Sequence, residues 1–225
     1  MATRAQRAVR RTDALSKRRI VEAAIELLDT GGESALTFRA LAAHLATGSG
    51  AIYHHVDNKD DLLAAATNDV IAHVVTEAAA DAGPREAIRT VALGVFDAID
   101  AHPWLGAHLS RTPSLVAMPQ LFEGFGGPLQ ALGVPEQAQF DSASALVSYT
   151  LGVAGQNAAN AHLFPPGVTD RGAFLGQAAA RWKRLDPARY PFVHKIAPQL
   201  PEHDDREQFL AGIDLILAGA AALTP

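Results

Sequence analysis

Between residues 37 and 59, apolar residues recur at the three- and four-residue spacing of amphipathic helices. Phe38, Leu41 and Leu45 form one stripe, and Ile52 and Val56 form a second. The residues between the stripes, 46–49, are small or polar, as a tight turn between two short helices requires. The pattern predicts a helix-turn-helix, although an ordinary corner between two core helices would share it.

Small polar residues precede each predicted helix of this region. Ser16, Thr37 and Ser49 can each cap the following helix by accepting hydrogen bonds from its free N–H groups. Asn58 is placed in the same way before a helix over residues 59–80. We therefore expect three short or medium helices that share one core, followed by a longer helix that leaves it.

The apolar faces of the first and fourth helices indicate which of their residues form the core. The first helix is expected to end at Gly31 and Gly32, because glycine commonly terminates helices. Its inner face consists of Ile20, Ala23, Ala24, Leu27 and Leu28. The inner side of the helix over residues 59–80 is expected to consist of Leu62, Leu63, Ala66, Val70, His73 and Val74.

The rest of the chain is also predicted to be helical. Helices are expected over residues 85–101, 102–112, 114–132, 135–163 and 204–223. The first of these has a regular apolar face made of Ile88, Val91, Ala92, Val95, Phe96 and Ile99. The fold class is thus all-α, with a flexible basic arm at 1–15, a three-helix helix-turn-helix domain at 16–60, and a larger helical domain at 81–225. Residues 165–203 either form a lid or cover the bundle.

Two late helices have more apolar surface than one core can cover. Residues 135–163 and 204–223 are apolar on more than one face, and a helix with so little polar surface must be covered on both sides. Small residues accompany these faces, namely Gly152, Gly155, Gly212 and Gly219. We expect a two-fold homodimer in which these helices pair as a four-helix bundle, and a large monomeric core is the alternative.

The charge is distributed unevenly along the chain. The 225 residues carry a formal net charge of -5, yet residues 1–59 have nine Lys and Arg against six Asp and Glu. This asymmetry favours contact with phosphates at the N-terminal end only. The four arginines of residues 1–15 form either a mobile arm that contacts DNA or a solvated tail.

Residues 16–64 resemble the DNA-binding domain of TetR-family transcriptional regulators. The resemblance is carried by residues 52–56 and 57–63, and upstream by residues 20–24, 31–32 and 36–42. The turn departs from the family pattern, which usually has Gly-Val-Ser at 46–48 and Lys at 49. The resemblance implies a ligand-responsive regulator, in most cases a repressor, that binds an inverted-repeat DNA operator as a homodimer.

A helix-turn-helix docks its second helix in the major groove with the N-terminal residues leading. Ser49, Gly50 and Ala51 occupy these positions, so specificity is expected from the Ser49 hydroxyl, the Ala51 methyl group, Arg39 from the preceding helix and DNA shape. By resemblance to the family, phosphate contacts are expected from Thr37, Tyr53, His54 and Lys59. The alternative for Tyr53 is a half-buried packing role, and His55 is expected to pack within the small domain.

The family resemblance implies a small-molecule effector site in the second domain. Aromatic residues with sparse amides and imidazoles suit such a mostly apolar pocket. The candidates are Phe96, Trp104, His108, Phe122, Phe125, Tyr149, Gln156, Asn157, Asn160 and Trp182. Each aromatic residue alone is more typical of a plain core than of a ligand site. Because no charged cluster accompanies them, we expect a neutral, largely apolar ligand that shifts the helix over residues 59–80.

Other functional classes find little support. No HExxH, GxSxG, P-loop or dinucleotide fingerprint occurs, so an enzyme is not expected, nor a cofactor or a metal site. The absence of cysteine and of long apolar runs fits a cytoplasmic protein without a membrane partner. The alternatives that remain are a transcriptional activator, and a helical binding protein or enzyme that has the head without operator function.

Overall fold

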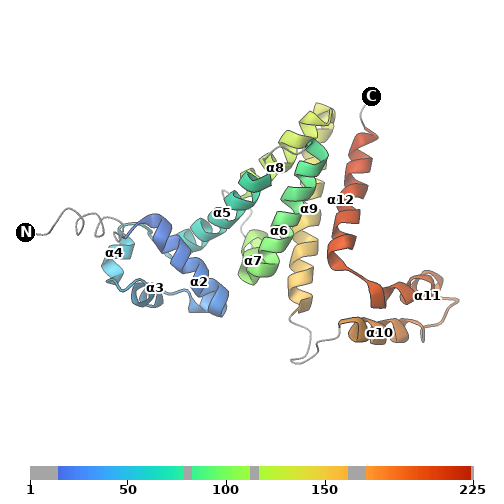
Figure 1. Ribbon diagram of the computed structural model, residues 1–225, viewed down its shortest axis with the longest axis horizontal. Coiled ribbons are helices and arrows are strands. Elements are labelled where there is room, and N and C mark those ends of the chain that lie inside the picture. Colours follow the sequence, from blue (N-terminus) through green and yellow to red (C-terminus); the bar gives the residue numbers. More distant parts are fainter. Residues whose placement is uncertain (1–14, 79–82, 112–116, 162–170, 224–225) are drawn as a thin grey trace, which may run out of the picture.

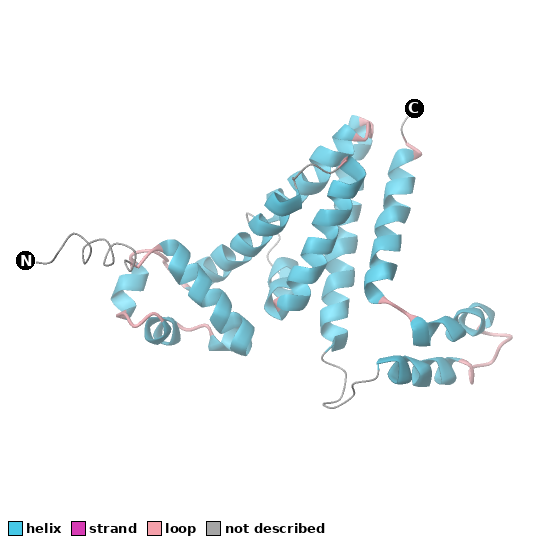
Figure 2. Cartoon of the chain, in the orientation of Figure 1, coloured by secondary structure: helices cyan, strands magenta, loops and turns pink. Residues whose placement is uncertain are grey.

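The computed structural model describes residues 15–78, 83–111, 117–161 and 171–223. Within these ranges every regular element is a helix, as Figure 2 shows, so the predicted all-α class is confirmed. Apart from Leu15, the predicted arm at 1–15 lies outside the described residues. In the described part of the chain, no helix has the length and apolarity needed to cross a membrane.

The N-terminal head consists of three helices around one small core. They are α2 (Lys17–Ala35), α3 (Phe38–His44) and α4 (Ser49–Tyr53), which lie at one end of the molecule in Figure 1. Their apolar stripes meet as the spacing predicted. The fully buried side chains are those of Ile20, Ala24, Leu28, Leu36, Leu41 and Ile52. This core holds α4 at the surface of the head.

Three of the four predicted helix caps are present. The side-chain oxygens of Ser16, Thr37 and Asn58 each accept a hydrogen bond from the N–H three residues further along, at 3.3, 3.1 and 2.9 Å respectively. The cap predicted at Ser49 is wrong. Gly48 is the extended residue before α4 and makes no side-chain cap, whereas Ser49 is already helical. The chain enters the helix one residue earlier than the polar side chain suggests.

The backbone of the head has unusual conformations at two places, Gly31–Gly32 and Ala46. Gly32 has a φ of 65° and Gly31 is also non-helical, so α2 is interrupted where the sequence predicted, although helical turns resume as far as Ala35. Ala46, in the turn before α4, adopts a φ of 50°. A left-handed alanine costs about 1–2 kcal/mol relative to a right-handed one, and glycine would avoid this cost.

Helix α5 (Lys59–Ala78) leaves the head and enters the body (Figure 1). Leu62, Leu63, Ala66 and Ile71 are buried along it. His73 was expected on this inner side and is instead exposed, with its ring Nδ1 2.9 Å from the carbonyl oxygen of Asp69. Ile71 rather than His73 belongs to the buried stripe of α5, and the imidazole of His73 is exposed to solvent.

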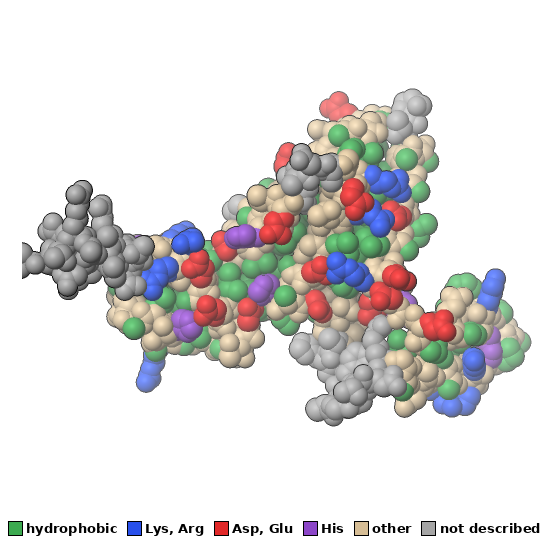
Figure 3. Space-filling model, in the orientation of Figure 1, with side chains coloured by type: hydrophobic (Ala, Val, Ile, Leu, Met, Phe, Trp, Pro, Cys, Tyr) green, Lys and Arg blue, Asp and Glu red, His purple; other side chains and the backbone are tan. Residues whose placement is uncertain are grey.

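The body is a bundle of five further helices with an additional helical segment. The bundle comprises α6 (Pro84–Ala101), α7 (Pro103–Arg111), α8 (Ala117–Ala131), α9 (Glu136–Ala161) and α12 (Asp205–Ala221). All six residues predicted for the inner face of α6 are buried. The arm segment, defined as α10 (Arg171–Trp182), α11 (Pro191–Ile196) and the 3₁₀ helix η1 (Ala197–Glu202), packs on itself and stands beside the bundle (Figure 1). In the space-filling view of Figure 3 it forms a lobe at the right of the bundle.

An aromatic contact fixes α12 to the bundle. Phe209 is completely buried, with its ring centroid 4.8 Å from that of Phe96 and 5.6 Å from that of Tyr149. Gly212 permits this arrangement, because a β-carbon there would lie 1.9 Å from the Tyr149 hydroxyl oxygen. Gly212 was expected on the outward face with Gly219, but it serves packing within the protomer.

Replacing Phe209 by Ala is expected to lower the free energy of unfolding by about 3–5 kcal/mol, because it removes a fully buried aromatic side chain. Urea unfolding at fixed protein concentration measures the change. Phe192→Ala is the matched control, since Phe192 on α11 is 68% exposed, and its effect should stay below about 0.5 kcal/mol. Equal losses in the two variants would contradict this account of the body.

Candidate DNA-binding surface and ligand pocket

The exposed face of α4 is small and polar. Ser49 and Gly50 are exposed, Ala51 is half-buried, and Ile52 anchors the helix in the core. A helix with such short side chains allows the backbone to approach a groove closely. The structure therefore presents the predicted base-contact residues at the surface.

Tyr53 packs within the head and also remains accessible to solvent. Its ring is stacked on Phe38, with centroids 4.3 Å apart and an interplanar angle of 2°, yet 54% of the residue remains exposed. The packing fixes the ring and leaves the rest of the residue accessible. His54 and His55 are also exposed. The expectation that His55 packs within the small domain is therefore wrong, because the short α4 ends before it and its ring reaches solvent.

The other predicted DNA-contact residues lie around α4 in different environments. Thr37 and Arg39 are exposed at the start of α3. Lys59 is half-buried, and its ammonium group donates a hydrogen bond to the carbonyl oxygen of Glu33. This bond ties the start of α5 to the end of α2, so Lys59 has a structural role that the sequence did not indicate.

A polar cluster joins the head to the body. One carboxylate oxygen of Asp29, on α2, lies 2.7 Å from the indole Nε1 of Trp104 and 2.7 Å from the Nδ1 of His102. Four residues further along α2, Glu33 forms an ion pair with Arg111 at the other end of α7. Both ends of α7 are thus fastened to one helix of the head.

The opposite side of α7 lies against α9. A β-carbon on Gly106 would lie 3.1 Å from the Ile99 side chain and 3.8 Å from the Cα of Gly155. The absent side chain of Gly106 therefore leaves room for the backbone of α9. A β-carbon on Gly155 would meet no described atom within 4 Å, so its expected place in the dimer interface stays a prediction. Helix α7 thus connects α9 to α2, and sequence spacing gave no signal of this because the contacts are tertiary.

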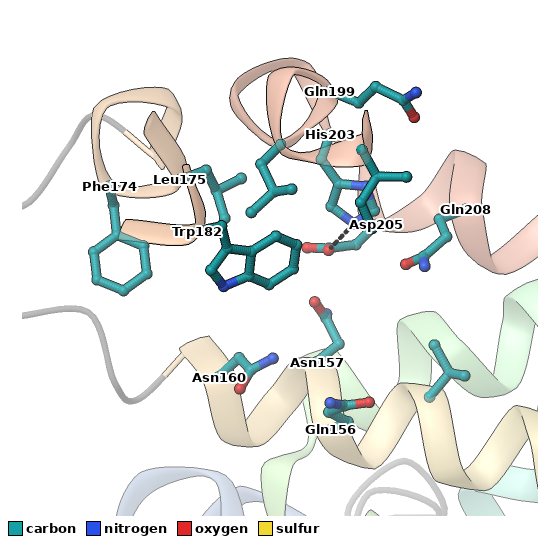
Figure 4. Close-up of a pocket in the computed structure, with 13 residues that line it drawn as sticks. Gln156, Asn157, Asn160, Phe174, Leu175, Trp182, Gln199, His203, Asp205 and Gln208 are labelled. Carbon is teal, nitrogen blue, oxygen red and sulfur yellow. Dashed lines mark ion pairs between the residues drawn. The ribbon is translucent and has the colours of Figure 1, made fainter. Parts of the chain in front are cut away.

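A pocket of about 750 Å³ opens between α9, the arm segment and the start of α12. Four of the predicted ligand-contact residues line it, namely Gln156, Asn157, Asn160 and Trp182. Figure 4 shows them with residues that the sequence did not single out. The additional lining residues are Val153, Phe174, Leu175, Ile196, Gln199, Leu200, His203, Asp205 and Gln208.

The other six predicted ligand-contact residues lie outside this pocket. Phe125 is fully buried in the core, Phe96 packs on Phe209, and Phe122 stacks on Phe140 at 6.0 Å. Tyr149 donates a hydrogen bond to the carbonyl oxygen of Phe209 at 3.3 Å, and burial raises the pKa of its phenol. Trp104 belongs to the cluster at Asp29, and His108 lies beside it on α7.

The pocket lining carries little charge. His203 Nε2 lies 3.1 Å from a carboxylate oxygen of Asp205, and none of the lining residues that the structure describes is Lys or Arg. The arm segment supplies most of the apolar lining, whereas α9 supplies carboxamides. Across the described residues, no group of three or more His, Asp or Glu side chains is arranged to hold a metal ion.

Comparison with known proteins agrees with this architecture. Residues 20–66 match the sequence profile described as bacterial regulatory proteins, tetR family. The transcriptional regulator SCO7222, a TetR from Streptomyces coelicolor, is 52% identical, and the likeness covers 94% of this chain and 100% of that one with a TM-score of 0.86. The chain belongs to the TetR family. It is a transcriptional regulator with a helix-turn-helix DNA-binding domain.

Two less similar proteins also match over most of the chain. The HTH-type transcriptional repressor DrrR1 of Streptomyces coeruleorubidus is 28% identical over 214 residues, which are 91% of this chain and 77% of that repressor. The TetR family protein ActR of Streptomyces coelicolor, in complex with actinorhodin, is 25% identical. That likeness covers 93% of this chain and 98% of ActR, with a TM-score of 0.72.

The buried imidazole of His108 makes the stability of this TetR-family protein depend on pH. Burial lowers the pKa of His108 from its ordinary value of 6.5, and Glu33, Arg111 and Asp60 act on it from α2, α7 and α5. Its Nε2 is buried without a hydrogen-bond partner among the described residues. Below about pH 6.5 the unfolded chain therefore binds a proton that the folded chain does not, and stability falls.

Replacing His108 by Leu is expected to remove this contribution, which changes by at most about 1.4 kcal/mol per pH unit. Urea unfolding between about pH 8 and pH 5 should show a shallower loss of stability in the variant than in the parent. His73 works in the opposite direction, because the carbonyl and carboxylate of Asp69 raise its pKa. Identical pH profiles for parent and His108→Leu would contradict the prediction.

Proposed function

We propose that this protein is a ligand-responsive transcriptional repressor that binds an inverted-repeat operator as a homodimer and is released by a small molecule. The observation that carries the proposal is helix α7, which is fastened to the head at Asp29 and Glu33 and lies against α9 at Gly155. It links the pocket to the DNA-binding head. The similarity to a repressor, DrrR1, supports repression as the outcome.

The head supplies the DNA contacts. Its α4 would enter the major groove with Ser49, Gly50 and Ala51 leading, and Arg39 would approach from α3. Tyr53, His54, Thr37 and Lys59 would contact phosphates on either side. Few of these groups distinguish bases by bidentate hydrogen bonds, so much of the specificity would come from DNA shape.

The outward faces of α9 and α12 supply the dimer interface. Phe140 on α9 is 71% exposed and Leu215 on α12 is 75% exposed, so both helices carry large apolar side chains that the protomer does not cover. Gly152 and Gly219 lie on the same two helices, and a β-carbon on either would meet no other described atom within 4 Å. Pairing these faces between two protomers would cover the apolar surface and place two heads on the two half-sites of an operator.

An effector in the pocket would act through the helices that line it. ActR, whose body has the same fold, has been solved with actinorhodin bound. Here a ligand against Gln156 and Asn157 would press on α9 beside Gly155, and α7 would carry the displacement to α2. Because Lys59 bonds to the Glu33 carbonyl, α5 would move with α2 and change the spacing of the heads. Such a ligand lowers operator affinity only if it prefers the displaced arrangement.

Selection from a pool of random duplex DNA at moderate salt tests the operator directly, and recovery of one inverted repeat is the expected result. On that operator, Tyr53→Phe should weaken binding about tenfold, since it removes a hydroxyl that bonds a charged phosphate while the ring stays stacked on Phe38. Tyr190→Phe, in the arm segment, is the matched control. Recovery of nothing above non-specific background would refute the repressor proposal.

The contact at Asp29 gives a second prediction. Asp29→Ala should reduce affinity for the selected operator at least about fivefold, because freely oriented heads populate the correct spacing less often. Binding to non-specific DNA should stay unchanged, since it needs no fixed spacing. Asp100→Ala is the matched control, because Asp100 is an exposed carboxylate of α6. Equal operator affinity in the Asp29→Ala variant and the parent would show that this contact does not position the head.

A further inference from the structure

Carboxamide side chains gather on one side of the pocket. Gln156, Asn157 and Asn160 project from adjacent turns of α9, and Gln208 and Gln199 join them from α12 and η1. In Figure 4, Asn157 and Asn160 lie between the α9 ribbon and Trp182. In the part of the chain that is described, none of these five amides is hydrogen-bonded to another residue. Their donors and acceptors are therefore available to a ligand.

A carboxamide offers one acceptor oxygen and one donor NH₂ group side by side. A hydroxyl group also donates and accepts, so several amides in one cavity match a ligand with several hydroxyl groups. Anionic ligands are instead held by Lys, Arg or clustered backbone N–H groups, and the described residues that line this pocket include no Lys or Arg. A cation would need a free carboxylate, whereas Asp205 is paired with His203. The polar side of the pocket therefore selects a neutral, hydroxyl-bearing molecule.

The opposite side of the pocket is apolar and partly aromatic. Trp182 and Leu175 of α10 face the carboxamides in Figure 4, and Ile196 and Leu200 extend the same wall. An indole face packs well against a flat ring system. The volume of about 750 Å³ suits a molecule of several rings. The ligand should therefore have one flat apolar face and one polar edge.

We infer that the pocket binds a neutral aromatic ring compound that carries a cluster of hydroxyl groups, with its rings against Trp182 and its hydroxyls on Gln156, Asn157 and Asn160. This class is more polar than the largely apolar ligand expected from sequence. The hydroxyls belong either to the ring system itself or to an attached sugar, since both present the same chemistry to the amides. The inference rests on the proposed effector role of this pocket.

Calorimetric titration of the full chain with four naphthalene probes distinguishes the possible classes of ligand. The probes are naphthalene, a dihydroxynaphthalene, a naphthyl glucoside and a naphthalene sulfonate. The hydroxylated probes should bind about tenfold or more tightly than naphthalene and the sulfonate, since each added hydrogen bond contributes a modest net gain. Preference for the glucoside would identify a sugar as the source of the hydroxyls, and preference for the diol would identify the ring.

Variants test which residues are responsible. Asn157→Leu keeps the size of the side chain and removes its hydrogen bonds, so it should weaken binding of the hydroxylated probes about tenfold and leave naphthalene binding unchanged. Gln177→Met is the matched control, because Gln177 is an exposed carboxamide of α10 outside the pocket. The chain has two tryptophans, so a Trp104→Phe variant also reports occupancy through the emission of Trp182 alone.

Several outcomes would overturn the inference. The strongest binding by naphthalene or by the sulfonate would contradict the assigned chemistry, and no binding by any probe would show that the pocket is filled or closed in solution. An unchanged affinity of Asn157→Leu would place the binding site elsewhere. Selection of an operator does not involve these probes, so an operator without probe binding refutes this inference alone. Probe binding without an operator refutes the repressor proposal alone.

Discussion

The contact between Asp29 and the first residues of α7 is the constraint on which the relation of head to body depends. One carboxylate oxygen receives both the indole N–H of Trp104 and the imidazole of His102. A carboxylate with two such partners holds direction as well as distance, because both rings are rigid. The ion pair of Glu33 and Arg111 adds a second polar contact between α2 and α7. These short polar contacts orient a head whose apolar core is continuous with that of the body.

Helix α7 lies between this contact and α9. At Gly106 it approaches α9 so closely that a β-carbon there would lie 3.8 Å from the Cα of Gly155. The pocket includes residues of α9 on both sides of Gly155, namely Val153 and Gln156. Helix α7 therefore contacts both the pocket-lining helix α9 and the helix α2 that carries Asp29.

Much of the fold follows from local rules in the sequence. The six-residue face of α6, the caps at Ser16, Thr37 and Asn58, and the break at Gly31 depend on spacing and on backbone chemistry that neighbouring residues determine. His73, His55 and Ser49 were misplaced because their environment depends on a shift of one or two residues in a helix. Spacing also could not reveal that Gly212 serves a contact within the protomer.

The two candidate sites also differ in how far local sequence patterns could predict them. The exposed face of α4 could be predicted because it is the complement of a local apolar stripe. The pocket was found only in part, through the amides of α9, because His203, Asp205 and Gln208 reach it from a distant segment. Trp104 was assigned to a ligand, yet its indole N–H is bound to the head. Aromatic composition indicates burial but not which partner causes it.

The left-handed Ala46 bears on how this regulator can acquire new operators. A single replacement by glycine would relieve about 1–2 kcal/mol of backbone strain in the turn without altering any side chain of α4. Substitutions on a recognition helix commonly reduce stability, and a small three-helix head tolerates little loss. Replacing Ala46 by glycine would therefore offset stability lost through substitutions on α4, and the fold would accept a wider set of α4 sequences.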